Sequence, residues 1–332
     1  MMAWAACFAC AGPRVPHSPK PGMVETSERE EDQGMVEEKG RTDHDSCPDW
    51  GELWTFDDPA GAEQRFRERA FEERRAGRSN CQEQALTQVA RAQGLQRKFA
   101  EGHRTLDELG ETDRLHGRSR AYALLERGRL FNSAGERDAA RPLFERAFAF
   151  SSTESMDDLA VDAAHMVAIA LMEEPALALS WNEKALDLCQ RSSDPRARRW
   201  KGSLLNNIGW TEFDLQRYED ALTTFVKLEE LRRVEGKTQQ VLIARYSQGK
   251  TLRKMGKTSA ALQLQEELLS SYEKAGLEAS GYVYEELGEC KLELGTGGHQ
   301  ADFQRAHEEL SKDPWLVDNE AERLERLERL SR

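Results

Sequence analysis

Several features that mark other classes of protein are missing from this sequence. Alternating runs of β-branched residues are almost absent, so no sheet is predicted. The chain has 332 residues, but no apolar stretch approaches the roughly 18 residues that a membrane-spanning helix needs. The net charge of −13 is opposite in sign to the basic surface of a general nucleic-acid binder. We therefore predict neither a membrane nor a nucleic acid as a partner.

Cysteine is scarce and scattered. Of the six cysteines, only Cys7 and Cys10 lie close together, whereas a zinc site needs about four closely spaced ligands. A structural disulfide framework is not expected in a chain of this length. The sequence therefore predicts free thiols, a reducing cytoplasmic compartment and no metal site.

Signatures of catalysis are missing as well. The seven histidines are dispersed, and no residue has the local signature of a catalytic nucleophile. The glycine-rich run at 295–299 lacks the Lys-Ser/Thr ending of a nucleotide-binding loop. His165 lies in an apolar segment, which favours a buried, hydrogen-bonded histidine over a metal ligand. We therefore expect no catalytic residue, no cofactor and no enzymatic activity.

The first part of the chain, residues 1–48, is predicted to be a disordered acidic tail. Four prolines break any helix early, and nine acidic residues stand against three basic ones in the stretch 25–45. The apolar start lacks a positively charged leader, so a secretory signal is the weaker interpretation. Met23 or Met35 is an alternative start of the chain.

Residues that form helices dominate after residue 60, where Ala, Leu, Glu and Arg are abundant. Residues 49–83 are expected to cap the segment that follows, with a helix from about Ala60 to Arg75. Residues 315–332 predict a second, C-terminal capping helix, with three leucines on one face. Three leucines are too few for the heptads of a coiled coil.

A repeated pattern fills residues 84–314. It consists of a small residue followed by positions +7, +12, +16 and +19, and it is clearest at Gly128, Gly135, Ala140, Phe144 and Ala147. The units begin at Ala90, Gly128, Met166, Gly209, Gly249 and Gly288, at intervals of 38, 38, 43, 40 and 39 residues. The first, third and sixth units are degenerate. A fixed period in this range predicts stacked helix pairs.

The positions in this pattern have physical roles. Small residues let two antiparallel helices approach closely, and the large residue at +16 fills the groove beside them. The residue at +7 falls at a turn, where glycine supplies the positive φ that ends a helix. The pattern therefore predicts both the pairing of helices and the places where they end.

This pattern resembles tetratricopeptide repeats (TPR). The resemblance is carried by the unit from Gly128 to Ala147, by Ile208-Gly209 with Tyr218, Ala221 and Phe225, by Gly249-Gly256-Ala261, and by Leu287-Gly288. Each unit is longer than the family's repeat of about 34 residues, as in kinesin light chains and bacterial peptide-sensing regulators. HEAT-like repeats share this longer period, but the Gly and Ala positions favour TPR. The resemblance implies an all-α, right-handed α-solenoid of about six helix pairs.

In the TPR family, the first helix of each pair lines a concave groove that binds a partner. Carrying this face over gives the groove residues Arg129, Asn206, Asn207, Trp210, Phe213, Tyr246, Lys250 and Arg253. We expect Trp210 and Phe213 to hold an apolar anchor, and the two asparagines to bind the backbone of an extended segment. Lys250 and Arg253 are expected to hold an acidic or carboxylate end, and the sixth unit adds an acidic patch of four glutamates. In the alternative, Trp210 or Phe213 packs into the core and the charges are merely solvated.

These features predict an interaction scaffold or adaptor that binds a protein or peptide segment in the groove. The alternative is a regulatory sensor that binds a small peptide and changes conformation. A further possibility is autoinhibition, in which the acidic stretch 25–45 occupies the basic patch at Lys250 and Arg253. The sequence carries no signal for the oligomeric state.

Overall fold

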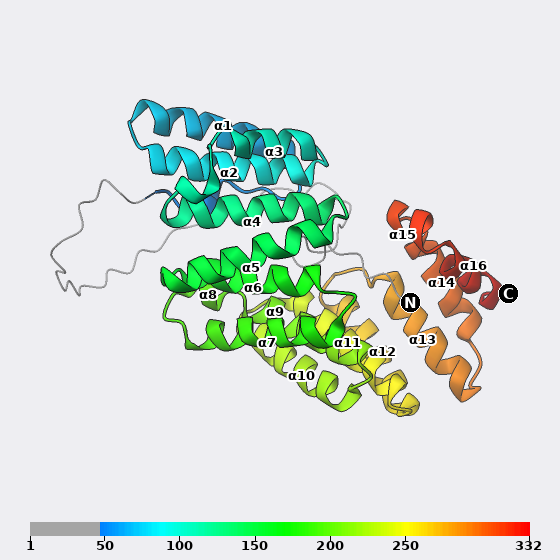
Figure 1. Ribbon diagram of the computed structural model, residues 1–332. Coiled ribbons are helices and arrows are strands. Elements are labelled where there is room, and N and C mark those ends of the chain that lie inside the picture. Colours follow the sequence, from blue (N-terminus) through cyan, green and yellow to red (C-terminus); the bar gives the residue numbers. More distant parts are fainter. Residues whose placement is uncertain (1–46) are drawn as a thin grey trace, which may run out of the picture. The chain divides into compact units, whose positions relative to one another are not determined.

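The computed structural model describes residues 47–332 (Figure 1). Within that range the secondary structure is entirely helical, so the fold is all-α. The predicted tail, the alternative starts of the chain and the autoinhibitory stretch 25–45 lie outside the described residues. The chain divides into two compact units, Met1–Ala147 and Phe148–Arg332. None of the described helices is long and apolar enough to cross a membrane.

The first unit contains a short 3₁₀ helix followed by consecutive α-helices. Their bounds are η1 Trp50–Leu53, α1 Pro59–Arg75, α2 Ser79–Leu95, α3 Phe99–Asp107, η2 Thr112–Arg114, α4 Gly117–Ser133 and α5 Arg137–Thr153. The last of these crosses the division between the units. The predicted helix at 60–75 is therefore present as α1. The division of the chain at 83/84 stays a prediction, and α2 runs across that point.

The second unit continues the same alternation. Its helices are α6 Asp157–Ala170, α7 Pro175–Arg191, α8 Pro195–Arg198, α9 Lys201–Asp214, α10 Tyr218–Val234, α11 Thr238–Lys254, α12 Thr258–Lys274, α13 Gly281–Leu294, α14 His299–Leu310, α15 Pro314–Asn319 and α16 Ala321–Leu330. The helix pairs α6–α7, α9–α10, α11–α12 and α13–α14 pack side by side. The short helix α8 is inserted between two pairs, and it accounts for the longest interval in the repeat.

Glycine sets the separation of the paired helices, as the sequence pattern predicts. A Cβ added to Gly209 would lie 2.6 Å from Cε1 of Phe225, the large residue at +16. The same contact recurs between Gly128 and Phe144, and between Gly288 and Phe303. All three phenylalanines are fully buried, and burial of each such side chain contributes about 1.5–3 kcal/mol.

In five of the six units, the residue at +7 ends the first helix of the pair in the left-handed conformation, whereas Glu173 of the third unit does not take it. Gly135 has φ 88° and Gly256 has φ 76°, while Arg97 and Gln216 take the same conformation with φ 61°. A residue with a Cβ is strained there, so these two units accept a small penalty at a position where glycine fits better. The predicted left-handed turn therefore forms in the first and fourth units without a glycine.

A disulfide bond fastens the start of the described chain. Cys47 is bonded to Cys81 of α2, and Trp50 and Trp54 each donate an indole N–H hydrogen bond, 3.0 Å long, to a glutamine of α2. The prediction of free thiols is wrong for this pair, because residues 34 apart in sequence are brought together by packing of the segment on α2. Cys189 and Cys290 are buried free thiols.

Candidate partner-binding surface

The residues predicted for the groove lie on three helices in two units. Arg129 belongs to α4 of the first unit, where its guanidinium pairs with the buried carboxylate of Glu126. The other seven residues belong to the second unit: Asn206, Asn207, Trp210 and Phe213 on α9, and Tyr246, Lys250 and Arg253 on α11. The second unit therefore brings together most of the predicted site.

The two aromatic residues of α9 have different environments. Phe213 is only 8% exposed and packs edge-on against Tyr218, with ring centroids 5.4 Å apart, so it belongs to the core. Trp210 is partly exposed, and its ring rests edge-on against Phe213 and Phe225 at 5.4 and 5.1 Å. Of the predicted pair of anchors, Trp210 alone presents a ring at the surface, on a base of buried aromatic side chains.

The two asparagines of α9 also differ. Asn207 points inward, and its Nδ2 lies 3.3 Å from Nδ1 of His165 on α6. His165 is 1% exposed, and the same Nδ1 lies 3.4 Å from Oδ1 of Asn182 on α7. Asn206 is partly exposed and donates to Oδ1 of Asn207 over 3.4 Å. The prediction of a buried, hydrogen-bonded His165 is confirmed, and both asparagines are partly exposed.

The two cations predicted to receive a carboxylate already have one. Lys250 Nζ lies 3.2 Å from Oε1 of Glu286 on α13, and Arg253 donates two hydrogen bonds to the same carboxylate over 2.8 and 3.0 Å. Arg253 also donates to Glu293 over 2.7 Å. Two of the four glutamates of the acidic patch predicted for the sixth unit, Glu286 and Glu293, are thus the partners of the basic patch of the fifth. The expected carboxylate-binding end does not fit this arrangement.

This ion-pair cluster is largely withdrawn from solvent. The side chain of Arg253 is 8% exposed and that of Glu286 is 2% exposed. Burial by itself would raise the pKa of Glu286, but Lys250 and Arg253 outweigh it and hold that pKa below its ordinary value. Tyr246 stands beside the cluster, with its hydroxyl 3.4 Å from Lys250 Nζ. The cluster is therefore a charged internal contact between α11 and α13.

A second set of ion pairs, which sequence reasoning missed, joins α13 to the C-terminal helix. Arg323 of α16 pairs with Glu285, and Arg326 pairs with Glu289. The signal was present in the Glu-Arg-Leu triplets at 322–330, but those residues show only a helix with charged edges. Which acids they meet depends on how the helices cross.

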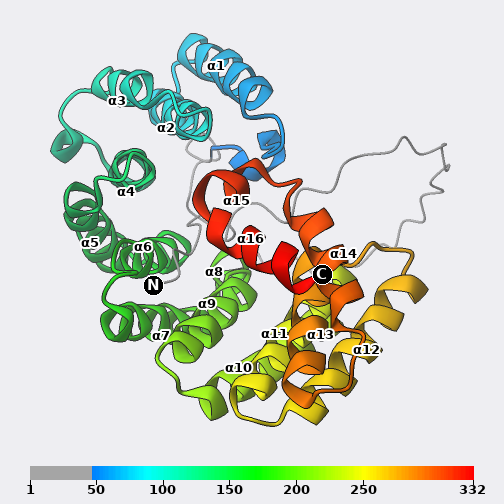
Figure 2. The ribbon, with the colours of Figure 1, turned by 90° about the vertical axis from the view of Figure 1, so that its right-hand side faces the viewer.

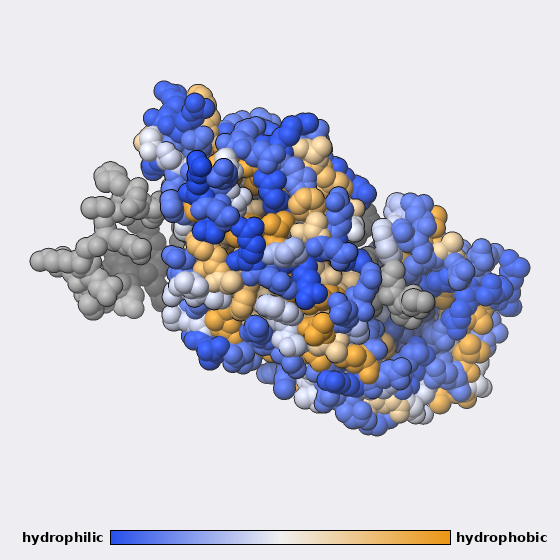
Figure 3. Space-filling model, in the orientation of Figure 1, coloured by the Kyte–Doolittle hydropathy of each residue, from blue (hydrophilic) through white to orange (hydrophobic). Residues whose placement is uncertain are grey.

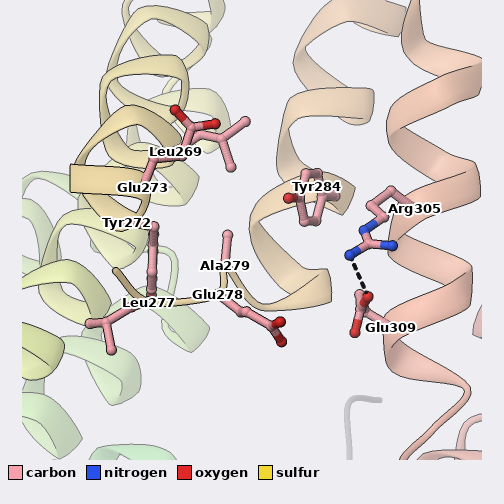
Figure 4. Close-up of a pocket in the computed structure, with 9 residues that line it drawn as sticks. All are labelled: Leu269, Tyr272, Glu273, Leu277, Glu278, Ala279, Tyr284, Arg305 and Glu309. Atoms are coloured by element: carbon pink, nitrogen blue, oxygen red, sulfur yellow. Dashed lines mark ion pairs between the residues drawn. The ribbon is translucent and has the colours of Figure 1, made fainter. Parts of the chain in front are cut away.

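A small pocket opens between α12, the loop after it, α13 and α14 (Figure 4). It is lined by leucine and tyrosine side chains together with the Arg305–Glu309 ion pair, and its volume is about 110 Å³. Sites for small molecules have volumes of about 300–1,000 Å³. The pocket is therefore too small for a cofactor. Among residues 47–332, no group of three or more His, Cys, Asp or Glu side chains is placed to hold a metal ion.

Part of the chain matches a known protein family. The model of the tetratricopeptide repeat family matches residues 200–274, which contain α9 to α12. No curated protein is similar enough in sequence to match the chain. The family match therefore covers two consecutive helix pairs of the second unit.

Three proteins of known structure share the fold at low sequence identity. The apo form of RapI superimposes with a TM-score of 0.63 at 12% identity, over 80% of this chain and 77% of RapI. Aspartyl phosphate phosphatase F from Bacillus subtilis superimposes with a TM-score of 0.56 at 14% identity, over 78% of this chain and 71% of the phosphatase. The apo form of the quorum sensor NprR from B. thuringiensis superimposes with a TM-score of 0.56 at 13% identity, over 81% of this chain and 77% of NprR. NprR in complex with its cognate peptide NprX superimposes with a TM-score of 0.52 at 13% identity, over 83% of this chain and 81% of NprR. These likenesses concern the fold, which consists of consecutively packed helix pairs, and the family match identifies residues 200–274 as tetratricopeptide repeats.

Proposed function

We propose that the second unit is an adaptor that binds a protein or peptide segment along the exposed face of α9 and the neighbouring part of α11. The observation that carries the proposal is the placement of Trp210. Its ring is partly exposed but is held from below by Phe213 and Phe225, and partly exposed aromatic anchors on a rigid base are typical of binding hot spots.

The residues around Trp210 suit an extended segment. Asn206 lies one helical turn before the tryptophan and carries a partly exposed amide that can donate and accept hydrogen bonds. Tyr246 on α11 adds a second partly exposed aromatic ring. Lys250 and Arg253 are left out of the proposed contact surface, because Glu286 and Glu293 already neutralise them. The partner therefore needs an apolar side chain and free backbone groups rather than an acidic end.

The proposal is tested by affinity purification with mass spectrometry on Trp210→Ala and Asn206→Ala chains. We expect proteins captured by the wild type to be lost, or reduced at least about tenfold, with Trp210→Ala, since truncation of a hot spot costs about 2 kcal/mol or more. Val226→Ala is the matched control, because Val226 is a 50% exposed side chain on the second helix of the same pair. An identical set of captured proteins for Trp210→Ala and the wild type would contradict the proposal.

The likeness to NprR supports a second candidate function. That protein is a quorum sensor seen with its cognate peptide, and we infer that this chain could bind a small peptide and respond by changing conformation. The two functions differ in their readout. A sensor would change its hydrodynamic radius or its hydrogen-exchange pattern far from Trp210 when a short ligand binds, whereas an adaptor would change only at the contact surface. In both functions the protein acts by binding and not by catalysis.

A further inference from the structure

Helix α13 carries two acidic edges, and each is neutralised by a different neighbour. On one edge, Glu286 and Glu293 pair with cations of α11, the preceding first helix. On the other edge, Glu285 and Glu289 pair with cations of α16, which is the last helix of the chain. The first edge is satisfied within the repeat stack. Among residues 47–332, the second edge forms its ion pairs only with the C-terminal helix.

Helix α16 packs against α14 and forms ion pairs with α13. Its buried side chains are Leu324 and Leu327, which pack in a cluster with residues of α14 and α15 such as Phe303 and Leu316. The guanidinium of Arg323 also lies 5.0 Å from the ring centroid of Tyr282. Figure 2 shows α16 beside α14 at the end of the second unit, and the surface over α13 to α16 is mostly hydrophilic in Figure 3.

The composition of α16 makes this contact reversible in principle. The helix has 10 residues, and an isolated helix of fewer than about 12 residues is marginal in water. Its order therefore depends on the acids of α13 and on the apolar cluster of α14. The ion pairs that hold the helix are partly buried: the side chains of Glu285 and Glu289 are 10% and 13% exposed, and those of Arg323 and Arg326 are 26% and 43% exposed. Salt screens such pairs less than fully exposed ones, so the contact is opened by a competing cationic helix rather than by salt alone.

We propose that α16 is an intramolecular latch, and that the face it covers is a docking site for an arginine-bearing amphipathic helix of a partner protein. This face, the latch site, consists of Tyr282, Glu285 and Glu289 of α13 with Phe303 and Leu310 of α14. The chemistry of the ligand follows from the resident helix. Arginines three residues apart meet the two carboxylates, and a leucine after each arginine enters the apolar cluster.

The latch site is distinct from the Trp210 surface, so this inference does not depend on the proposed adaptor function. A partner helix must compete with a segment that is tethered to its own site. Tethering raises the effective concentration of the resident helix to about the millimolar range. A closed latch therefore keeps weak partners out, and opening it makes the site available.

The test uses the full-length chain and a fluorescent synthetic peptide with the sequence of residues 314–332. In the chain with Arg323→Glu and Arg326→Glu, the resident helix meets Glu285 and Glu289 with like charges and should leave. We expect the peptide to bind this variant at least about tenfold more tightly than the wild type in fluorescence anisotropy, because the tethered competitor is gone. Equal affinity for the two chains would overturn the proposal.

Two further variants keep the result interpretable. Arg329→Glu reverses one charge of α16 at an exposed residue and should leave the latch closed, with peptide affinity as in the wild type. Adding Glu285→Arg and Glu289→Arg to the double variant restores opposite charges within the chain and should close the latch, which returns peptide binding to the wild-type level. Strong peptide binding by this fourfold variant would show that the acids of α13 are not the docking site. Circular dichroism confirms that each variant keeps its helix content.

Discussion

Gly209 controls how closely α9 and α10 approach. The ring of Phe225 occupies the space where a Cβ would be, only 2.6 Å away, and Phe225 is fully buried among neighbours that leave it little room to move. Helix propensity alone would make alanine better than glycine here by about 1 kcal/mol. Overpacking a core opposes that gain and costs about 1–3 kcal/mol.

We therefore expect Gly209→Ala to lower the free energy of unfolding by about 1–2 kcal/mol. Urea denaturation followed by circular dichroism measures the change. Phe225→Leu in the Gly209→Ala background should recover part of the loss, since the smaller side chain vacates the space of the new Cβ. A more stable Gly209→Ala chain would show that propensity, and not packing, decides this position.

Glu286 is the residue on which the buried charges of α11 depend. Glu286→Gln leaves Lys250 and Arg253 without their shared carboxylate, and breaking a buried pair in this way costs about 3–5 kcal/mol. Glu293→Gln is the control, because that side chain is 42% exposed and the loss should stay within about 1 kcal/mol. Similar losses for the two variants in urea denaturation would refute the buried role of Glu286.

The contribution of Glu286, paired with Lys250 and Arg253, to the free energy of unfolding depends on pH in a definite direction. The pKa of Glu286 is lower in the folded chain than its ordinary value of 4.5, because Lys250 and Arg253 outweigh the effect of burial. Its contribution to stability is thus complete above that value and is lost as the pH falls through the folded pKa. The stability difference between wild type and Glu286→Gln should accordingly be constant near neutral pH and shrink below about pH 4.5.

At the scale of elements, the segment before α1 is held by the Cys47–Cys81 bond and by two indole hydrogen bonds to α2. A disulfide that closes a loop of this length stabilises a protein by about 2–4 kcal/mol. We expect a reducing agent to lower the melting temperature of the wild type but not that of a Cys47→Ser, Cys81→Ser chain. Alkylation with peptide mapping checks the bond directly, and full labelling of both cysteines in the unreduced protein would exclude it.

Pairing within the repeat could be predicted from the sequence, whereas contacts between repeats could not. Gly209 and Phe225 lie 16 residues apart in two consecutive helices, so their spacing alone indicates that they meet. Lys250 and Glu286 lie on different pairs, and which charges meet depends on the angle at which α11 and α13 cross. The bond between Cys47 and Cys81 and the ion pairs that join α16 to α13 could not be predicted for the same reason.

At the scale of the whole molecule, the stacked pairs mean that each helix contacts mainly its neighbours in sequence. The packing of α9 against α7 and α10, and of α11 against α10 and α12, is of this kind. In such arrays stability is approximately a sum of terms for single repeats and for adjoining repeats. Local damage should therefore spread to the next pair and fade beyond it.

Hydrogen exchange measured by mass spectrometry tests this view of the second unit. Gly209→Ala should speed exchange most in α9 and α10, less in α7 and α11, and least in α13 and α14, because each step away from the substitution crosses one more interface. The Cys47→Ser, Cys81→Ser chain is the counterpart, with faster exchange in η1, α1 and α2. A uniform increase along α6 to α16 in Gly209→Ala would instead mean that the second unit opens as one cooperative block, in which a repeat has no stability of its own.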